Sequence, residues 1–132
     1  MKKYFFCFLA TSLLFSSLLA DQQNRNPYND YTQFYIDKIN REDGEIVIKF
    51  NIPVNPESVT TKSILINNMP LSEEIKFLFN RNADKLVIYE DSSWQDMTLK
   101  IEVKGLISYN NILMENFLAI TLKPDDKYER DN

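Results

Sequence analysis

The sequence predicts an all-β fold, a sandwich of about seven short strands that is preceded by a signal peptide. Apolar residues alternate with polar ones at a period of two, and turn signals separate these runs about every 8 to 12 residues. The chain also lacks amphipathic stretches that could serve as crossover helices, which excludes a parallel α/β fold. Of its 132 residues 44% are apolar and 13% aromatic, a composition that suits one packed domain.

The first twenty residues have the pattern of a secretory signal peptide. Lys2 and Lys3 give a positive start, an apolar run follows over residues 4–19, and Ala20 offers a small residue for cleavage. The alternative is an uncleaved membrane anchor, but the run is shorter than the ~20 apolar residues of a spanning helix. We expect removal of residues 1–20, export to the periplasm or the cell surface, and no membrane span in the mature chain.

The charge and residue types of the mature chain exclude several function classes. The formal net charge of −4 becomes more negative by two units once Lys2 and Lys3 are removed, and no basic stripe indicates a nucleic-acid partner. The only cysteine, Cys7, lies in the signal segment, and the chain has no histidine. Disulfides, structural zinc sites, thiol nucleophiles and histidine bases are therefore excluded. We expect no cofactor and no metal.

Residues 21–33 are polar and show no period of either kind, so we expect a linker before a domain at residues 34–123. Aromatic residues gather at this border and have two interpretations. They form a recognition patch, or the later ones begin the first strand and pack inward. The residues concerned are Tyr28, Tyr31, Phe34 and Tyr35.

A proline corner at residues 50–59 follows the first clear alternation, residues 45–50. Pro53 and Pro56 each fix their own φ and lack a backbone N–H, and each pushes the preceding residue toward extended geometry. Neither can lie inside a central strand or a helix. The corner is expected to be rigid and to carry the chain across to its next strand.

Further strands are expected at residues 63–67, 75–79, 85–89, 99–103 and 117–123. Pro70 cannot continue the ladder after the first of these. A helix over residues 72–79 is the alternative to the second, but its apolar residues lie at period two and not 3.6. Residues 124–132 are expected to be a frayed, charged tail. The side chains expected to point inward are Ile48, Phe50, Ile64, Ile66, Phe77, Leu86, Ile88, Leu99, Ile101, Val103, Leu113 and Ile120.

The corner and its flanking strands resemble bacterial Ig-like domains of the surface-layer-protein type. The resemblance rests on Ile46–Val59 and Ser63–Ile66, and it continues through Lys85–Ile88, Leu99–Leu106 and Asn110–Leu113. It covers roughly Phe34 to Lys123.

The resemblance implies an Ig-like β-sandwich that serves as a spacer or binding module in an exported bacterial protein. It supplies no catalytic residues. The chain departs from the family at Ser108, where an aspartate is usual, and at residues 94–96, which replace a Leu-x-x-Gly approach. Asn110 stands where the family has glycine, so we expect a positive φ there, which asparagine tolerates.

Two acidic clusters are the candidates for chemistry. General acid and base catalysis needs two carboxylates whose environments differ, and calcium takes oxygen ligands from flexible loops. Both clusters fall at predicted turns, where acids are usually only solvated, and no calcium-loop motif is present. The clusters are Glu42, Asp43 and Glu45, and Glu90, Asp91 and Asp96 around Trp94.

We therefore expect a non-catalytic binding or assembly module of the bacterial envelope, with an envelope protein or a cell-wall component as its partner. The alternative is a small carboxylate-dependent hydrolase or inhibitor. Flat sheets with an open edge favour the first, and a pocket with two converging acids favours the second. The segment 75–80 has only Lys76 to guard it as an edge. The expected partner-binding residues are Tyr28, Tyr31, Tyr35, Leu78 and Trp94.

Overall fold

The computed structural model describes residues 31–114 and 118–131 of the chain. All of them belong to one compact unit, Tyr31–Asn132. The expected signal peptide and most of the expected linker, with Tyr28, lie outside the described residues. The described residues contain no α-helix, and so none long and apolar enough to cross a membrane.

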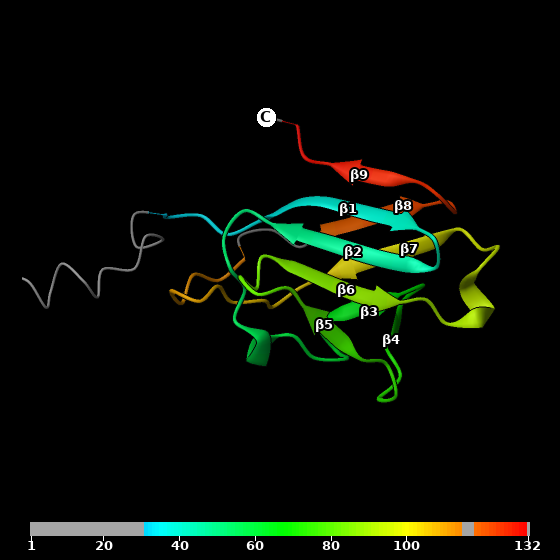
Figure 1. Cartoon of the computed structure of the whole chain (residues 1–132), viewed down its shortest axis with the longest axis horizontal. Helices are drawn as coiled ribbons and strands as arrows, with labels where there is room; N and C mark the ends of the chain where they lie inside the picture. Colours follow the sequence, from blue (N-terminus) through cyan, green and yellow to red (C-terminus); the bar gives the residue numbers. More distant parts are fainter. Residues whose placement is uncertain (1–30, 115–117, 132) are drawn as a thin grey trace, which may run out of the picture. The chain divides into compact units, whose positions relative to one another are not determined.

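Two antiparallel sheets form a β-sandwich, which confirms the predicted fold class (Figure 1). The first sheet has the order β5-β6-β2-β1-β9, and the second has the order β4-β3-β7-β8. The strands of the first sheet are β1 (Ile36–Glu42), β2 (Glu45–Phe50), β5 (Phe77–Phe79), β6 (Lys85–Tyr89) and β9 (Lys127–Glu129). Those of the second are β3 (Ile64–Ile66), β4 (Met69–Pro70), β7 (Leu99–Val103) and β8 (Leu118–Leu122).

The seven predicted strands correspond to β1, β2, β3, β5, β6, β7 and β8. Lettered A to G in chain order, they give the neighbours D-E-B-A in one sheet and C-F-G in the other. This is the strand arrangement of an Ig constant-type sandwich. The strands β4 and β9 are additions at the edges of the two sheets.

The core lies between the inner faces of the two sheets, where alternating residues of each strand point inward. Most of the side chains predicted to point inward are buried, as Ile48, Leu86 and Ile101 are, each 0% exposed. Phe77 and Ile120 are half-buried.

Leu113 was predicted to point inward, but it is 61% exposed, and Met114 is buried instead. The preceding turn explains the error. The positive φ expected at Asn110 occurs at Asn111, where φ is 64°. Since successive side chains of an extended segment point to opposite faces, a shift of one residue exchanges the inward and outward positions.

At the sheet edges one short strand was not predicted and one prediction is wrong. The strand β4 ends at Pro70, which pairs with Leu65 as the last pair of the ladder; an edge strand allows this because its outer side needs no N–H donor. The charged tail is not wholly frayed, since β9 pairs with β1. The Arg130 N–H donates to the Asp37 carbonyl, and the Arg41 N–H to the Asp126 carbonyl, both at 2.9 Å.

The predicted proline corner carries the chain from β2 in one sheet to β3 in the other. It contains the 3-10 helix η1 (Pro56–Ser58), whose N-terminus is capped by the Asn55 side chain. The Ser58 hydroxyl donates to the Asn55 carbonyl at 2.7 Å and accepts from the Ile107 N–H at 3.0 Å. These bonds fix the corner against the loop after β7.

Candidate functional site

An apolar row crosses the outer face of the five-stranded sheet. Leu78 of β5 lies opposite Val87 of β6, and Val87 lies opposite Val47 of β2. Leu78 is 42% exposed and the two valines are half-buried. Tyr89, which follows Val87 on the same face, is 55% exposed. Outward positions of a sandwich are usually polar, so this row is an unusual surface.

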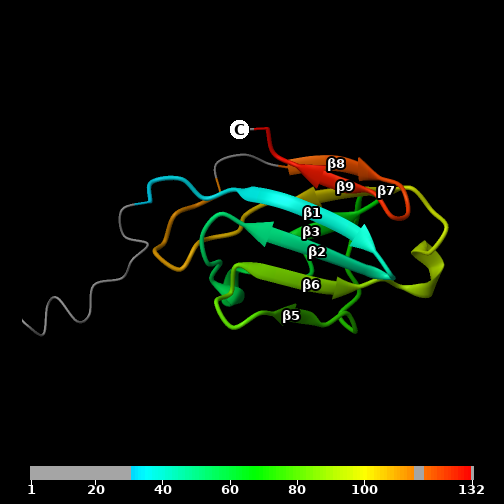
Figure 2. The same cartoon turned by 45° about the horizontal axis from the view of Figure 1, so that its top comes forward.

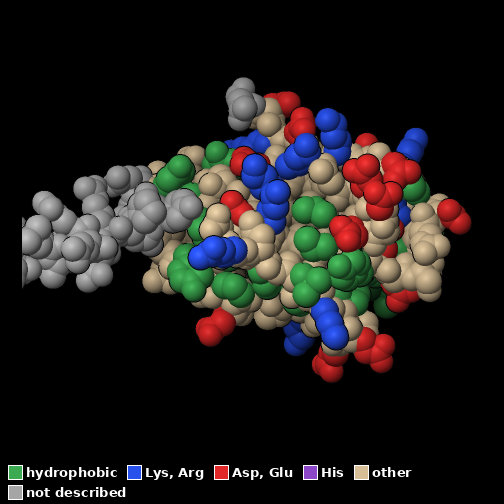
Figure 3. Space-filling model, viewed as in Figure 1, with side chains coloured by type: hydrophobic (Ala, Val, Ile, Leu, Met, Phe, Trp, Pro, Cys, Tyr) green, Lys and Arg blue, Asp and Glu red, His purple; other side chains and the backbone are tan. Residues whose placement is uncertain are grey.

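Charged rows of opposite sign flank the apolar row. On one side Lys85 lies opposite Lys49, and Lys49 lies opposite Lys38. On the other side Tyr89 lies opposite Glu45, which lies opposite Glu42. Figure 3 shows hydrophobic side chains on this face between lysine or arginine side chains and a group of acidic side chains.

The apolar row ends at β5, an edge strand with a neighbour on one side only among the described residues. The Asn80 N–H donates to the Lys85 carbonyl at 3.2 Å, so this pair is hydrogen-bonded. Since hydrogen-bonded and non-hydrogen-bonded pairs alternate along an antiparallel ladder, Leu78 also bonds toward β6. The backbone groups of Phe77 and Phe79 therefore point to the open side.

The other three edges are less open to a partner strand. The strand β4 has two residues, of which Pro70 lacks an N–H. Charged side chains on β9 oppose the addition of a strand there: the Glu129 carboxylate forms ion pairs with Lys38 at 3.0 Å and with Lys127 at 3.5 Å. The strand β8 lies beside β9 in both Figure 1 and Figure 2.

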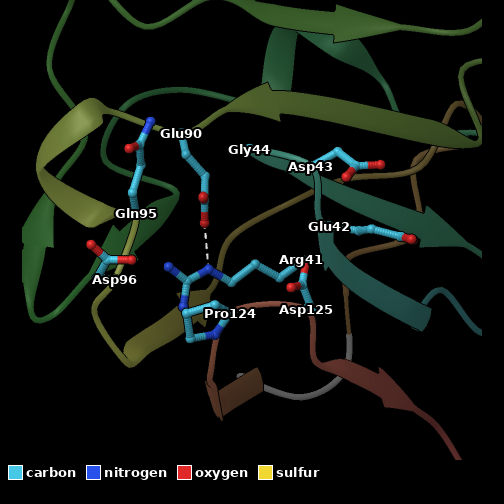
Figure 4. A pocket seen from close by; sticks show the side chains of 9 residues that line it. All are labelled: Arg41, Glu42, Asp43, Gly44, Glu90, Gln95, Asp96, Pro124 and Asp125. Carbon is cyan, nitrogen blue, oxygen red and sulfur yellow. Dashed lines mark hydrogen bonds and ion pairs between the residues drawn. The ribbon is translucent and has the colours of Figure 1, made fainter.

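A buried arginine occupies the end of the sandwich near the β1–β2 turn (Figure 4). Arg41 is 1% exposed and points inward from β1. Its guanidinium donates to the Glu90 carboxylate and to the backbone carbonyls of Trp94, Met97 and Leu122. Arg41 thus connects β1 with the end of β6, the loop around η2 (Ser92–Trp94), and β8 of the other sheet.

A cavity of about 360 Å³ opens beside this arginine. It brings together residues of the two acidic clusters, which lie far apart in the sequence. Glu90 is engaged by Arg41, and the other carboxylates are exposed, so they are not desolvated as a general acid must be. No three carboxylates within the described ranges are placed to hold a metal ion. The lining residues are Arg41, Glu42, Asp43, Gly44, Glu90, Gln95, Asp96, Pro124 and Asp125.

Asp91 of the same acidic cluster has a structural task. Its carboxylate accepts from the Ser93 N–H at 2.9 Å and caps η2. This backbone hydrogen bond holds the pKa of the Asp91 carboxyl below its ordinary value.

The described residues among those predicted to bind a partner lie on three separate elements. Tyr31, 48% exposed, and Tyr35 precede β1. The Arg130 guanidinium lies 3.8 Å from the centre of the Tyr35 ring, so this ring is in part covered from within the domain. Leu78 lies on β5, and Trp94 is half-buried in η2.

Val47, Val87 and Tyr89 were not predicted from the sequence to form part of a surface. The sequence pattern that could have indicated this surface is the presence of apolar residues at the outward positions of β2 and β6, whose inward positions are also apolar. Arg41 was missed because the alternation of β1 was not followed as far as its end, where a charged side chain occupies an inward position.

Comparisons with protein-family models, with characterised proteins and with solved structures find no match to this chain. The fold and the surface define the class: a small β-sandwich in which, among the described strands, β5 forms an open, apolar sheet edge.

Proposed function

We propose that the protein is a non-catalytic binding or assembly module that accepts a partner strand at β5. The observation that carries the proposal is the open edge of β5 together with the apolar row that begins at Leu78. An edge strand offers its unpaired N–H and C=O groups to an added strand, and neighbouring side chains select which strand fits.

The apolar row explains why strand addition here stabilises a complex. An added strand would cover Leu78 and extend the row outward, and burial of apolar area contributes about 25 cal/mol per Å². The edge lacks the usual protection, since its three residues include no charge and no proline.

The expected setting is the bacterial envelope, on the basis of the signal-peptide pattern and the resemblance to Ig-like domains of exported proteins. Strand addition requires a peptide backbone, which favours an envelope protein over a cell-wall polysaccharide as the partner.

The acidic cavity is the observation that favours the alternative, a small carboxylate-dependent hydrolase or inhibitor. Its arrangement supports a structural task better. A retaining or inverting carboxylate pair needs one protonated and one ionised group free to meet a substrate. Glu90 is instead held by Arg41, and Asp96 is exposed.

The test is capture of partners from the envelope extract of the source cell by the protein and by two matched variants. Leu78→Lys places a charge on the β5 edge, and Leu113→Lys makes the same change at an exposed site off this sheet. We expect Leu78→Lys to lose partners that Leu113→Lys retains, with equal melting temperatures. Retention of every partner by Leu78→Lys would rule out the β5 surface.

A further inference from the structure

We infer that β5 pairs with β5 of a second copy of this chain, antiparallel and centred on Leu78. This inference rests on the proposed function, strand addition at β5, and names the occupant. It follows from the hydrogen-bonding positions of β5, the apolar row and the flanking charges.

The backbone groups of β5 are complementary to themselves. Phe77 and Phe79 point their N–H and C=O groups to the open side, and Leu78 points its groups to β6. When a second β5 approaches in the antiparallel sense, Phe77 lies opposite Phe79 of the second copy, and Phe79 lies opposite Phe77. Each of these pairs exchanges two N–H···O=C bonds. Leu78 then faces its own equivalent in a non-hydrogen-bonded pair, where the Cα atoms are about 4.5 Å apart.

The apolar rows of the two copies merge in this arrangement. Leu78 is the outermost residue of a row that continues through Val87 to Val47. Contact between the two leucines joins these rows into one strip across both sheets. It covers the most exposed aliphatic side chain of the row.

The charges favour the antiparallel sense over the parallel one. An antiparallel pair centred on Leu78 places Lys76, the residue before β5, opposite Asn80 of the second copy. It also reverses the second sheet, so that the row of Lys85 and Lys49 and the row that contains Glu45 lie at the same end of the pair. An in-register parallel pair would place Lys76 opposite Lys76 of the second copy and the two lysine rows at the same end. Like charges placed side by side on a sheet are destabilising. The charges therefore favour the antiparallel sense.

The length of β5 limits the strength of this dimer. Stable interfaces bury about 800 Å² on each partner, more than a three-residue edge supplies. We expect a weak dimer that forms as the protein concentration rises, as suits a chain that assembles only where it is concentrated.

Disulfide trapping tests the inference in the full chain with Cys7→Ser, which leaves no other thiol. Leu78→Cys is expected to form a covalent dimer under mild oxidation, because non-hydrogen-bonded cross-strand pairs have the Cα separation that a disulfide needs. Lys76→Cys is the register control. Its two thiols lie four residues apart along an antiparallel pair, about 13 Å, which no disulfide spans. In an in-register parallel pair they would meet.

Lys49→Cys, exposed on the central strand β2, measures random collision between copies. Trapping of Leu78→Cys well above both controls supports the inference. Equal trapping of Leu78→Cys and Lys49→Cys overturns it, and efficient trapping of Lys76→Cys overturns the antiparallel sense.

Sedimentation equilibrium over a range of concentrations gives a second measurement without a cysteine. Loss of the dimer in Leu78→Lys, with the dimer intact in Leu113→Lys and both variants folded, supports the inference. A monomer at every concentration overturns it. In that case a partner captured by the protein and lost in Leu78→Lys would leave the proposed function standing, so the two failures are distinguishable.

Discussion

Replacement of Arg41 by methionine should strongly destabilise the domain. Methionine retains an apolar stem of similar length but supplies no donor. Glu90, whose side chain is 6% exposed, would remain as a buried carboxylate without its cation. Three backbone carbonyls, those of Trp94, Met97 and Leu122, would lose a charged donor.

The expected loss is a large part of the stability of a domain this size. Breaking a buried ion pair by removing one partner costs about 3–5 kcal/mol, whereas a whole domain is stable by about 5–15 kcal/mol. A loss of 1 kcal/mol lowers the melting temperature of a domain of about 100 residues by about 4 °C or more. Arg41→Met should therefore melt at least about 12 °C below the parent.

Urea and thermal unfolding of four proteins measure the effect. These are the parent, Arg41→Met, Glu90→Leu and the double variant. We expect the double variant to be more stable than Arg41→Met, because it no longer buries an unpaired carboxylate, yet less stable than the parent, because the carbonyls still lack donors. A loss below about 1 kcal/mol in Arg41→Met, as for an exposed pair, would refute this account.

Four further outcomes are expected. Ile101→Asp should abolish cooperative unfolding, because it places a carboxylate in the core, whereas Leu113→Asp should melt as the parent does; equal melting would contradict the assigned faces. Excess chelator should leave the melting temperature unchanged, and a fall of several degrees would reveal an oxygen-ligand metal site. The hydrogen bond from Lys38 lowers the pKa of the Glu129 carboxyl from its ordinary value of 4.5. The stability that the ionised Glu129 contributes is therefore present above pH 4.5 and is lost as the pH falls through the lowered pKa. NMR titration should show that the pKa of Glu129 rises in Lys38→Met. Mass spectrometry of the protein from cells should find a mature N-terminus just after Ala20, and a species that begins at Met1 would contradict export by cleavage.

The alternation of apolar residues was enough to predict seven strands and most of the inward faces. In β2 and β7 every second residue is apolar, and a strand with one buried face requires this pattern. The pattern failed where one residue in a turn decides the parity, as Asn111 does for Leu113. It also failed at β9, whose three residues include two charged side chains and pair with a strand far away in the sequence.

Of the apolar row on the outer face, only Leu78 was named from the sequence as a binding residue. Its segment, residues 75–80, was also expected to be a poorly protected sheet edge. The rows of the outer face were not predictable from the chain alone. They arise from the registers that place β5, β6 and β2 side by side, and these depend on long-range pairing. The same holds for the hydrogen bonds of Arg41, whose acceptors lie in two segments far from it in the sequence, residues 90–97 and Leu122.

The pairing of β9 with β1 has a mechanical consequence. The strands are antiparallel, so the start of β1 and the end of β9 lie at the same end of the sandwich. Tension between the two ends of the domain would therefore load the bonds of this ladder one after another, from the Arg130–Asp37 bond to the Arg41–Asp126 bond, and peel β9 away at low force. Peeling would then reach Arg41, whose guanidinium also holds the Leu122 carbonyl of β8. Beyond this point the resistance would rise, so β9 should detach at a lower force than the force that unfolds the rest of the sandwich.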